Sequence, residues 1–240
     1  AAAKGMKLIE EQRLRARELY AGALAMDNGE FSEVALESLR EAIRLDNQED
    51  YQALYNKMSS YTRLLKVPDD FPTISEALAA ARTNDKVRVG RGTFTESLML
   101  DVKVDLEGAG REATIIQCEA KSASVVLVTR EASGSRIAGL ALQQTGMVLT
   151  AERYPVALAD GSELSLEDCH LEHGSGHGVA VINGGRARLR NVRVVKCGWD
   201  GLAVNGEGSS AEAVDCRFES NFHHGVDAWG GGRVAIRKSR

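Results

Sequence analysis

The chain has 240 residues, of which 43% are hydrophobic and 27% are charged, a composition typical of a globular protein with one large or two modest domains. Its formal net charge of −4 provides no basic field that would attract nucleic acid or an anionic membrane. No run approaches the roughly 20 apolar residues of a membrane span. We therefore expect neither a nucleic-acid partner nor membrane insertion.

The chain begins Ala1-Ala-Ala, without an initiator methionine and without the apolar centre of a signal peptide. We interpret it as a fragment or a processed product. The compartment stays undetermined, and an extracytoplasmic location would fit the loss of an upstream signal.

Residues 6–65 are rich in Ala, Leu, Glu and Arg and are apolar at helical spacing. Residues 16–46 are predicted to form a helical hairpin with its turn at residues 27–29, and a third helix is predicted over 49–65. Large and small side chains alternate as in a tetratricopeptide repeat at Leu19, Ala23, Ala35, Leu39 and Ala42. The hairpin resembles one such repeat, although Gly22 and Asn47 depart from its pattern. A generic amphipathic hairpin is the alternative.

Pro68 and Pro72 end the helical region, because prolines this close together do not continue a helix. We place a domain boundary here, giving an α-helical domain over 1–66 and a second domain over 67–240. The second domain opens with a capping-box pattern at Thr73 and Glu76, which predicts a short helix that closes the end of the following structure.

The second domain contains a regular repeat. Gly178, Gly201 and Gly225 each open a short apolar strand, at intervals of 23 and 24 residues. Such a period predicts a β-solenoid whose coils bury their apolar faces against one another. A second strand in each repeat is expected to point these residues inward: Leu166, Cys169, Leu171, Leu189, Val192, Val194, Ala213, Cys216 and Phe218.

Four sequence runs in the second domain resemble a known family and indicate which type of solenoid it forms. The runs are Phe71 to Leu78, Gly92 to Leu98, Val104 to Gly110 and Thr114 to Ile116. They resemble the opening of right-handed parallel β-helix proteins of the pectin-lyase-like superfamily, and of pectin methylesterases in particular. The resemblance implies a mainly β fold, a right-handed parallel β-helix of about six coils over 68–240, preceded by the helical hairpin and the capping helix.

The catalytic residues of pectin methylesterases have no counterparts here. Pro155 stands where the family has a catalytic Gln, and the stretch from Glu172 to His177 lacks the family's first catalytic Asp. The second Asp motif and the Arg motif are also missing. Gly92 and Glu96, which the chain shares with the family, are then explained as a corner turn and a contact of the first coil. We assign no catalytic residue.

The residues just before the repeated glycines align in two columns. The first holds His177, Asp200 and His224, and the second includes Trp199 and His223. Stacked coils place equivalent residues about 4.8 Å apart, so ligands spread over His177, Asp200 and His224 are too far apart for one zinc ion. We predict no metal and no cofactor. The columns are interpreted either as turn residues that tolerate unusual backbone angles or as contacts to a sugar or another ligand.

Two carboxylates are available for hydrolysis at this edge. Asp200 lies in the first column, and Asp227 is displaced by three residues in a strand where it is expected to face outward. Paired carboxylates about 5 to 10 Å apart can hydrolyse a glycosidic bond. An enzyme of this superfamily would be marked by a cluster of Asp, Arg and Lys side chains on one sheet, which this segment lacks.

The four cysteines, Cys118, Cys169, Cys197 and Cys216, match no zinc pattern. Cys169 and Cys216 fall in one inward column but two coils apart, about 9.6 Å, which is too far for a disulfide. We interpret them as small buried hydrophobes.

We expect a noncatalytic module that recognises a carbohydrate or a protein along the β-helix surface, with Trp199, Trp229 and His223 as an aromatic platform. Corner packing is the alternative role for Trp229. A polysaccharide lyase, hydrolase or epimerase is the alternative function. The candidate ligand-binding residues are His177, Trp199, Asp200, His223, His224, Asp227 and Trp229. Because residues 232–240 begin a coil without completing it, we also expect further coils beyond Arg240 and self-association through the open end.

Overall fold

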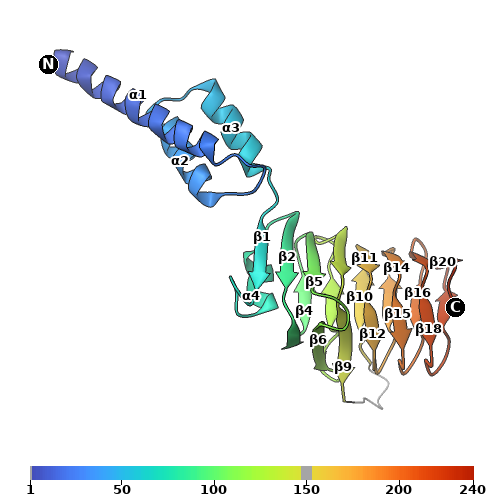
Figure 1. Cartoon of the computed structure of the whole chain (residues 1–240). Helices are drawn as coiled ribbons and strands as arrows, with labels where there is room; N and C mark the ends of the chain where they lie inside the picture. The colour runs from blue at the N-terminus through green and yellow to red at the C-terminus, as the bar shows by residue number, and fades with distance from the viewer. Residues whose placement is uncertain (1, 147–152) are drawn as a thin grey trace. The chain divides into compact units, whose positions relative to one another are not determined.

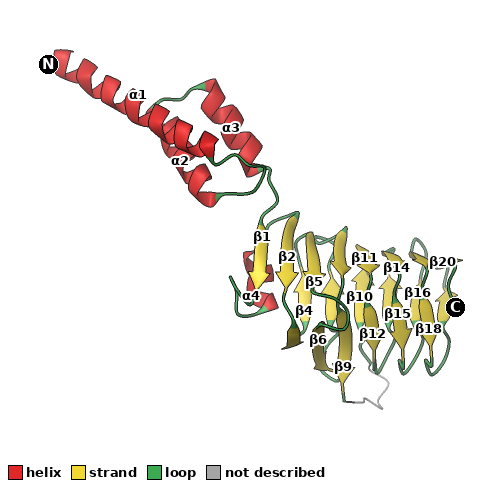
Figure 2. Cartoon of the chain, in the orientation of Figure 1, coloured by secondary structure: helices red, strands yellow, loops and turns green. Residues whose placement is uncertain are grey.

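The computed structural model describes residues 2–146 and 153–240 (Figures 1 and 2). The chain divides into two compact units, Ala1–Arg63 and Leu64–Arg240. Each unit has a hydrophobic core of its own.

The first unit consists of three helices, α1 (Ala2–Ala25), α2 (Glu33–Leu45) and α3 (Glu49–Ser59). Helix α2 begins where the Ser32 hydroxyl accepts a hydrogen bond from the amide of Ala35, an N-cap that satisfies one free backbone donor. The main core of the unit is formed by Ala23, Ala35, Leu36, Leu39, Leu54 and Met58. In the described part of the chain, no helix is both long and apolar enough to cross a membrane.

The predicted hairpin is present as α1 and α2. Of the residues expected to pack inside it, Ala23, Ala35, Leu39 and Ala42 are buried, and Leu19 is partly buried. The likeness to a tetratricopeptide repeat stays a prediction.

The predicted end of the third helix is wrong. Helix α3 stops at Ser59, and Leu64–Val67 forms strand β1 instead of a last helical turn. Leu65 and Val67, two residues apart, point inward, and β1 pairs with β2 of the second unit. The alternation of buried and exposed side chains in this segment is that of a strand and not of a helix.

The second unit is a parallel β-helix with three sheets, in which every pairing between strands is parallel. We call the sheets A, B and C. Sheet A contains, in spatial order, β1 (Leu64–Val67), β2 (Asp85–Val89), β5 (Val104–Gly108), β8 (Ser135–Ala138), β11 (Glu163–Glu167), β14 (Arg186–Arg190), β17 (Ser210–Val214) and β20 (Arg233–Arg237). Sheet B contains β3 (Gly92–Thr95), β6 (Thr114–Glu119), β9 (Ala141–Thr145), β12 (His170–Glu172), β15 (Arg193–Val195) and β18 (Arg217–Glu219). Sheet C contains β4 (Leu98–Leu100), β7 (Val126–Val128), β10 (Ala157–Asp160), β13 (Val179–Ile182), β16 (Leu202–Asn205) and β19 (Val226–Trp229).

One strand from each sheet makes a coil, and the described strands complete six coils, from β2–β3–β4 to β17–β18–β19 (Figure 1). Equivalent residues stack directly: Leu106, Ile137, Leu166 and Leu189 pair in one inward column of sheet A. The predicted inward residues are buried except Phe218, which is only partly buried. Its strand, β18, lies at the edge of sheet B, so no described strand stacks on its outer side.

A short helix, α4 (Ile74–Ala80), covers the first coil as predicted, with Ile74, Ala77 and Leu78 in the β-helix core. The Thr73 hydroxyl caps it by accepting from the amide of Glu76 at 3.1 Å. The Glu96 carboxylate accepts from the amides of Ile74 and Ser75 at 3.0 and 2.8 Å, which places negative charge at the positive end of the helix. The expected structural role of Glu96 is thus confirmed.

The repeated glycines allow the coils to approach each other. A β-carbon at Gly178 would lie 2.6 Å from the carbonyl oxygen of Gly201, and one at Gly201 would lie 2.6 Å from that of Gly225. No side chain fits at such a distance, which explains why the period of the sequence is marked by glycine.

Candidate functional site

Three polar residues precede consecutive strands of sheet C, at the corner where the chain enters that sheet. His177, Asp200 and His224 come just before the glycines that lead into β13, β16 and β19. Backbone bonds hold the corners in register: the amide of Gly178 donates to the carbonyl of Asp200, and that of Gly201 to the carbonyl of His224. The column predicted from the repeat is therefore present.

The carboxylate of Asp200 joins the two histidines. Its Oδ2 lies 3.1 Å from Nδ1 of His177, and its Oδ1 lies 2.9 Å from Nδ1 of His224. Oδ1 also accepts the backbone amide of His224 at 3.1 Å. Both oxygens of one carboxylate are thus held by groups from the coils on either side, which fixes the orientation of Asp200.

Burial is graded across this column. The Asp200 side chain is 5% exposed and that of His177 17%, whereas His224 is 65% exposed. Burial lowers the pKa of His177 below its usual range, since it disfavours the imidazolium, while the charge of Asp200 acts in the opposite direction. The inner end of the column is thus largely buried, and the outer end faces solvent.

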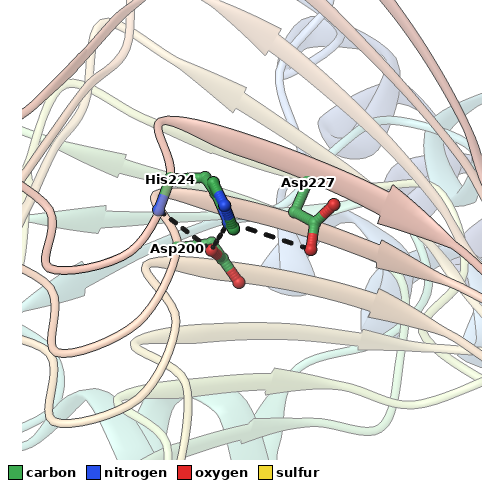
Figure 3. A group of neighbouring side chains, drawn as sticks. All are labelled: Asp200, His224 and Asp227. Carbon is green, nitrogen blue, oxygen red and sulfur yellow. Dashed lines mark hydrogen bonds and ion pairs between the residues drawn. The ribbon is translucent and has the colours of Figure 1, made fainter.

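Asp227, on β19, extends the column into a cluster (Figure 3). Its Oδ2 lies 4.0 Å from Nδ1 of His224, and the ring of His224 sits between the carboxylates of Asp227 and Asp200 (Figure 3). One ligand-type atom from each of the three side chains falls within 4.8 Å of the others. The predicted outward direction of Asp227 agrees with its 42% exposed side chain.

Two tryptophans meet the same histidine. The ring centroid of His177 lies 4.9 Å from that of Trp199 and 6.2 Å from that of Trp229. The guanidinium of Arg153 lies 5.3 Å from the centre of the Trp199 ring, within cation–π range. Arg153 also donates to the carbonyls of Ser175 and Gly198, which ties it to the neighbouring coils.

His223 is placed differently from the rest of the predicted platform. Its ring contacts Phe222 at 5.5 Å and His224 at 6.2 Å, and neither tryptophan is among these partners. Phe222 itself is 80% exposed. Sequence reasoning missed Phe222 and Arg153, because neither occupies a column of the repeat that carries other aromatic or charged side chains.

An apolar stripe on the outward side of sheet C leads to the cluster. It is formed by consecutive paired residues, one from each strand: Met99, Leu127, Leu158, Ala180, Ala203 and Asp227. Ala180 and Ala203 are buried although they point away from the core. The stripe ends at the only charged member, Asp227, beside Asp200 and His224.

The interpretation of His177, Asp200 and His224 as residues with unusual backbone angles is wrong. Among the described residues, the non-glycine positions with positive φ do not include them. Asp168, Asn191, Asp215 and Lys238 take this conformation instead, at φ of 51° to 56°, and so do His173, Lys196 and Ser220. The first set forms the tight corners between sheets A and B, and the second set forms the corners that follow the strands of sheet B. Left-handed backbone angles therefore do not explain the residue types in the Asp200 column.

A hollow lies on the outward side of sheet B. It has a volume of about 270 Å³, and its lining includes Arg111, His170, Arg193 and Arg217. His170, Arg193 and Arg217 pair in one column. Burial lowers the pKa of His170, and its Nε2 has no hydrogen-bond partner in the described structure. The sequence had singled out no site here.

All four cysteines are free and buried, as expected. Burial raises the pKa of Cys197 to about 12 and that of Cys169 to about 11. The thiolate form is therefore strongly disfavoured at neutral pH, and these residues act as core packing.

Comparison with known proteins places the second unit. Residues 103–240 match the family described as the right-handed β-helix region. No curated protein is similar enough in sequence to count as a relative.

Solved structures with the same fold include the catalytic domain of a GH87 α-1,3-glucanase in complex with nigerose, 14% identical, with a TM-score of 0.60 over 70% of this chain and 31% of that one. An aspartate-to-alanine variant of such a domain, also with nigerose, is 14% identical with a TM-score of 0.62 over 74% of this chain and 34% of that one. A pectin methylesterase variant in complex with a hexasaccharide is 14% identical with a TM-score of 0.50, over 75% and 67% of the two chains. The chain spans about a third of the length of the glucanase domains.

Proposed function

The chain belongs to the family of right-handed β-helix proteins, and from that premise we propose that the outward side of sheet C binds a carbohydrate without cleaving it. The observation that carries the proposal is the group of rings around the buried Asp200. His177, Trp199 and Trp229 form a connected aromatic surface on that side of the β-helix.

The chemistry of this surface suits a sugar. A pyranose ring has apolar faces that pack on aromatic side chains, and hydroxyls that need hydrogen-bond partners at the edge. Trp229, 41% exposed, offers ring surface, and the carboxylate of Asp227 offers an acceptor. Further along the stripe, exposed Met99 and half-buried Leu127 and Leu158 offer more apolar surface on the same side of sheet C.

Structures of the same fold support this choice in a general way. The glucanase domains were determined with nigerose and the pectin methylesterase variant with a hexasaccharide, so the fold accommodates sugar ligands in those proteins. A protein lying along the same stripe is the other partner that the sequence suggested.

The test is a binding screen of the full chain against soluble α- and β-glucans, xylan and pectins of different esterification, by affinity electrophoresis and calorimetry. We expect one class to bind, and Trp199→Ala to weaken it by about tenfold or more, which corresponds to about 1.4 kcal/mol. Arg188→Ala, an exposed long side chain of sheet A, is the control and should bind as the parent does. If no polysaccharide binds, or if Trp199→Ala binds as tightly as the parent, the proposal fails.

Cleavage is the second candidate, and one observation favours it. The carboxylates of Asp200 and Asp227 approach to within 4.8 Å, close to the spacing of about 5 to 5.5 Å in retaining glycosidases. Against it, Asp200 is 5% exposed and both its oxygens are engaged by histidines, so the carboxylate is poorly placed to reach a sugar carbon. Release of reducing ends or unsaturated products from the bound polysaccharide, abolished in Asp227→Asn, would establish the enzyme instead.

A further inference from the structure

We propose that Asp200, His224 and Asp227 bind a single divalent transition-metal cation of the zinc class. The inference begins from the convergence of three donor atoms: Oδ1 of Asp200, Nδ1 of His224 and Oδ2 of Asp227 (Figure 3). They come from two neighbouring coils, so the stacking of the β-helix builds the site. No other described trio of histidine, cysteine and acidic side chains brings its ligand atoms together in this way.

The distances fit a small ion. Ligands at about 2.1 Å around a tetrahedral zinc ion lie about 3.4 Å from one another. Nδ1 of His224 is 2.9 Å from Asp200 and 4.0 Å from Asp227, which brackets this value. The three donor atoms lie within 4.8 Å of one another, and because His224 and Asp227 are largely or partly exposed, their side chains can move by the roughly 1 Å that brings the longest separation to the value for zinc.

The charges favour a cation. Two carboxylates face one imidazole, and the imidazolium form of His224, protonated on both ring nitrogens, is the only positive charge that the three side chains can supply among themselves. A divalent ion in place of the proton on Nδ1 would contact all three donors. The imidazole nitrogen directs the site toward zinc-like transition metals, since calcium and magnesium prefer sites made of oxygen alone.

Asp200 is held as a metal ligand needs to be. Its second oxygen, Oδ2, faces Nδ1 of His177 at 3.1 Å, and the backbone amide of His224 fixes Oδ1. Partners of this kind orient a ligand and raise the affinity of metal sites. His177 is thus a positioning residue for Asp200 and not a ligand. Because His224 is the only histidine that contacts the ion, the large separation of His177 and His224 is no objection to the site.

The site would leave positions open. Three protein ligands do not complete the coordination of zinc, and His224 and Asp227 face solvent. Water or a sugar hydroxyl could take the remaining positions. Metal binding is nevertheless measured without any sugar, so it stands or falls independently of the proposed carbohydrate.

The test is calorimetric titration of ZnCl2 into the full chain after treatment with EDTA, with CaCl2 and MgCl2 in parallel. We expect one zinc ion per chain and much weaker binding of calcium and magnesium. His224→Ala and Asp227→Asn should each weaken zinc binding by more than about tenfold, and His177→Gln by about 10- to 100-fold, the usual effect of losing an outer partner.

His223→Ala is the matched control, because His223 is the adjacent histidine and its ring contacts His224, but it is not one of the three residues whose donor atoms converge. It should bind zinc as the parent does, and thermal unfolding should show that all four variants are folded. No zinc uptake, calcium binding tighter than zinc, or a loss in His223→Ala equal to that in His224→Ala would each overturn the assignment.

Discussion

The outward sides of sheets A and C are built on the same coils but carry opposite chemistry. On sheet A, charges alternate from coil to coil: Arg136 bonds Asp105 and Glu167, each at 2.8 Å, and Lys86 pairs with Glu107 at 2.9 Å. On sheet C, the corresponding stripe is apolar and ends in the Asp200 cluster. Core packing constrains neither outward side, so the difference reflects what each side does.

Charges on the outward side of sheet A are neutralised by ion pairs within the sheet. Charged side chains of its ladder form ion pairs with partners on the adjacent coil, as Glu163 does with Arg186 and Arg188. Such a face needs no ligand to satisfy it. Sheet C instead gathers rings and carboxylates at one corner, which is where we place the binding site.

The largest expected effect on stability comes from adding a carboxylate to the outward side of sheet C. Ala203 lies between Ala180 and Asp227 and is buried, so Ala203→Asp would bury a charge with an acid as its neighbour. We expect a loss of about 3 kcal/mol or more in the free energy of unfolding. Urea titration followed by circular dichroism measures it.

The matched change on sheet A is Ser165→Asp, because Ser165 pairs with Arg136 on one side and Arg188 on the other. There the new carboxylate gains cationic neighbours, and stability should change by no more than about 0.5 kcal/mol. Equal losses in Ala203→Asp and Ser165→Asp would show that the two faces do not differ as described.

An intermediate effect is expected from breaking the ladder of sheet A. Arg136→Met leaves Glu167 without its cation, while Asp105 keeps Lys86 nearby. About two thirds of the Arg136 side chain is shielded from solvent, so the loss should be about 1 kcal/mol rather than that of a fully exposed pair. The double variant Arg136→Met with Glu167→Met should recover part of it, and a chemical unfolding series in low and high salt tests both points.

The smallest expected effects are changes in stability with pH, which occur in different pH ranges for His177 and for Glu107 of sheet A. Burial lowers the pKa of His177 below its ordinary 6.5, so the unfolded chain takes up this proton first and stability falls as pH drops below about 6.5. The hydrogen bond from Lys86 lowers the pKa of Glu107 below its ordinary 4.5, so the stability it provides is lost only as pH falls below about 4.5.

Melting temperatures between pH 8 and pH 3 check these windows. His177→Gln should flatten the profile in the upper window, and Glu107→Gln in the lower one. His170, whose pKa is also lowered by burial, keeps part of the upper step in His177→Gln. A profile that His177→Gln leaves unchanged would contradict the burial of its imidazole.

Sequence alone determined the β-helix, because its physical cause is local and periodic. The glycine column is required where a β-carbon would lie 2.6 Å from a carbonyl oxygen of the next coil, and the inward columns follow from a period of two within each strand. The capping box at Thr73 predicted the helix that covers the first coil. The repeat count also placed His177, Asp200 and His224 in one column.

Only the tertiary structure decided the rest. Leu64–Val67 is a strand because it pairs with β2, a partner some 20 residues away that no local pattern reveals. Asp227 joins Asp200 and His224 through side-chain direction at a coil corner, which a column count does not specify. Arg153 reaches Trp199 from two coils earlier, across a distance in sequence that only the stacking closes. Sequence periodicity thus defines which residues stack, whereas the conformations of the side chains at the corners define what the stacked residues can bind.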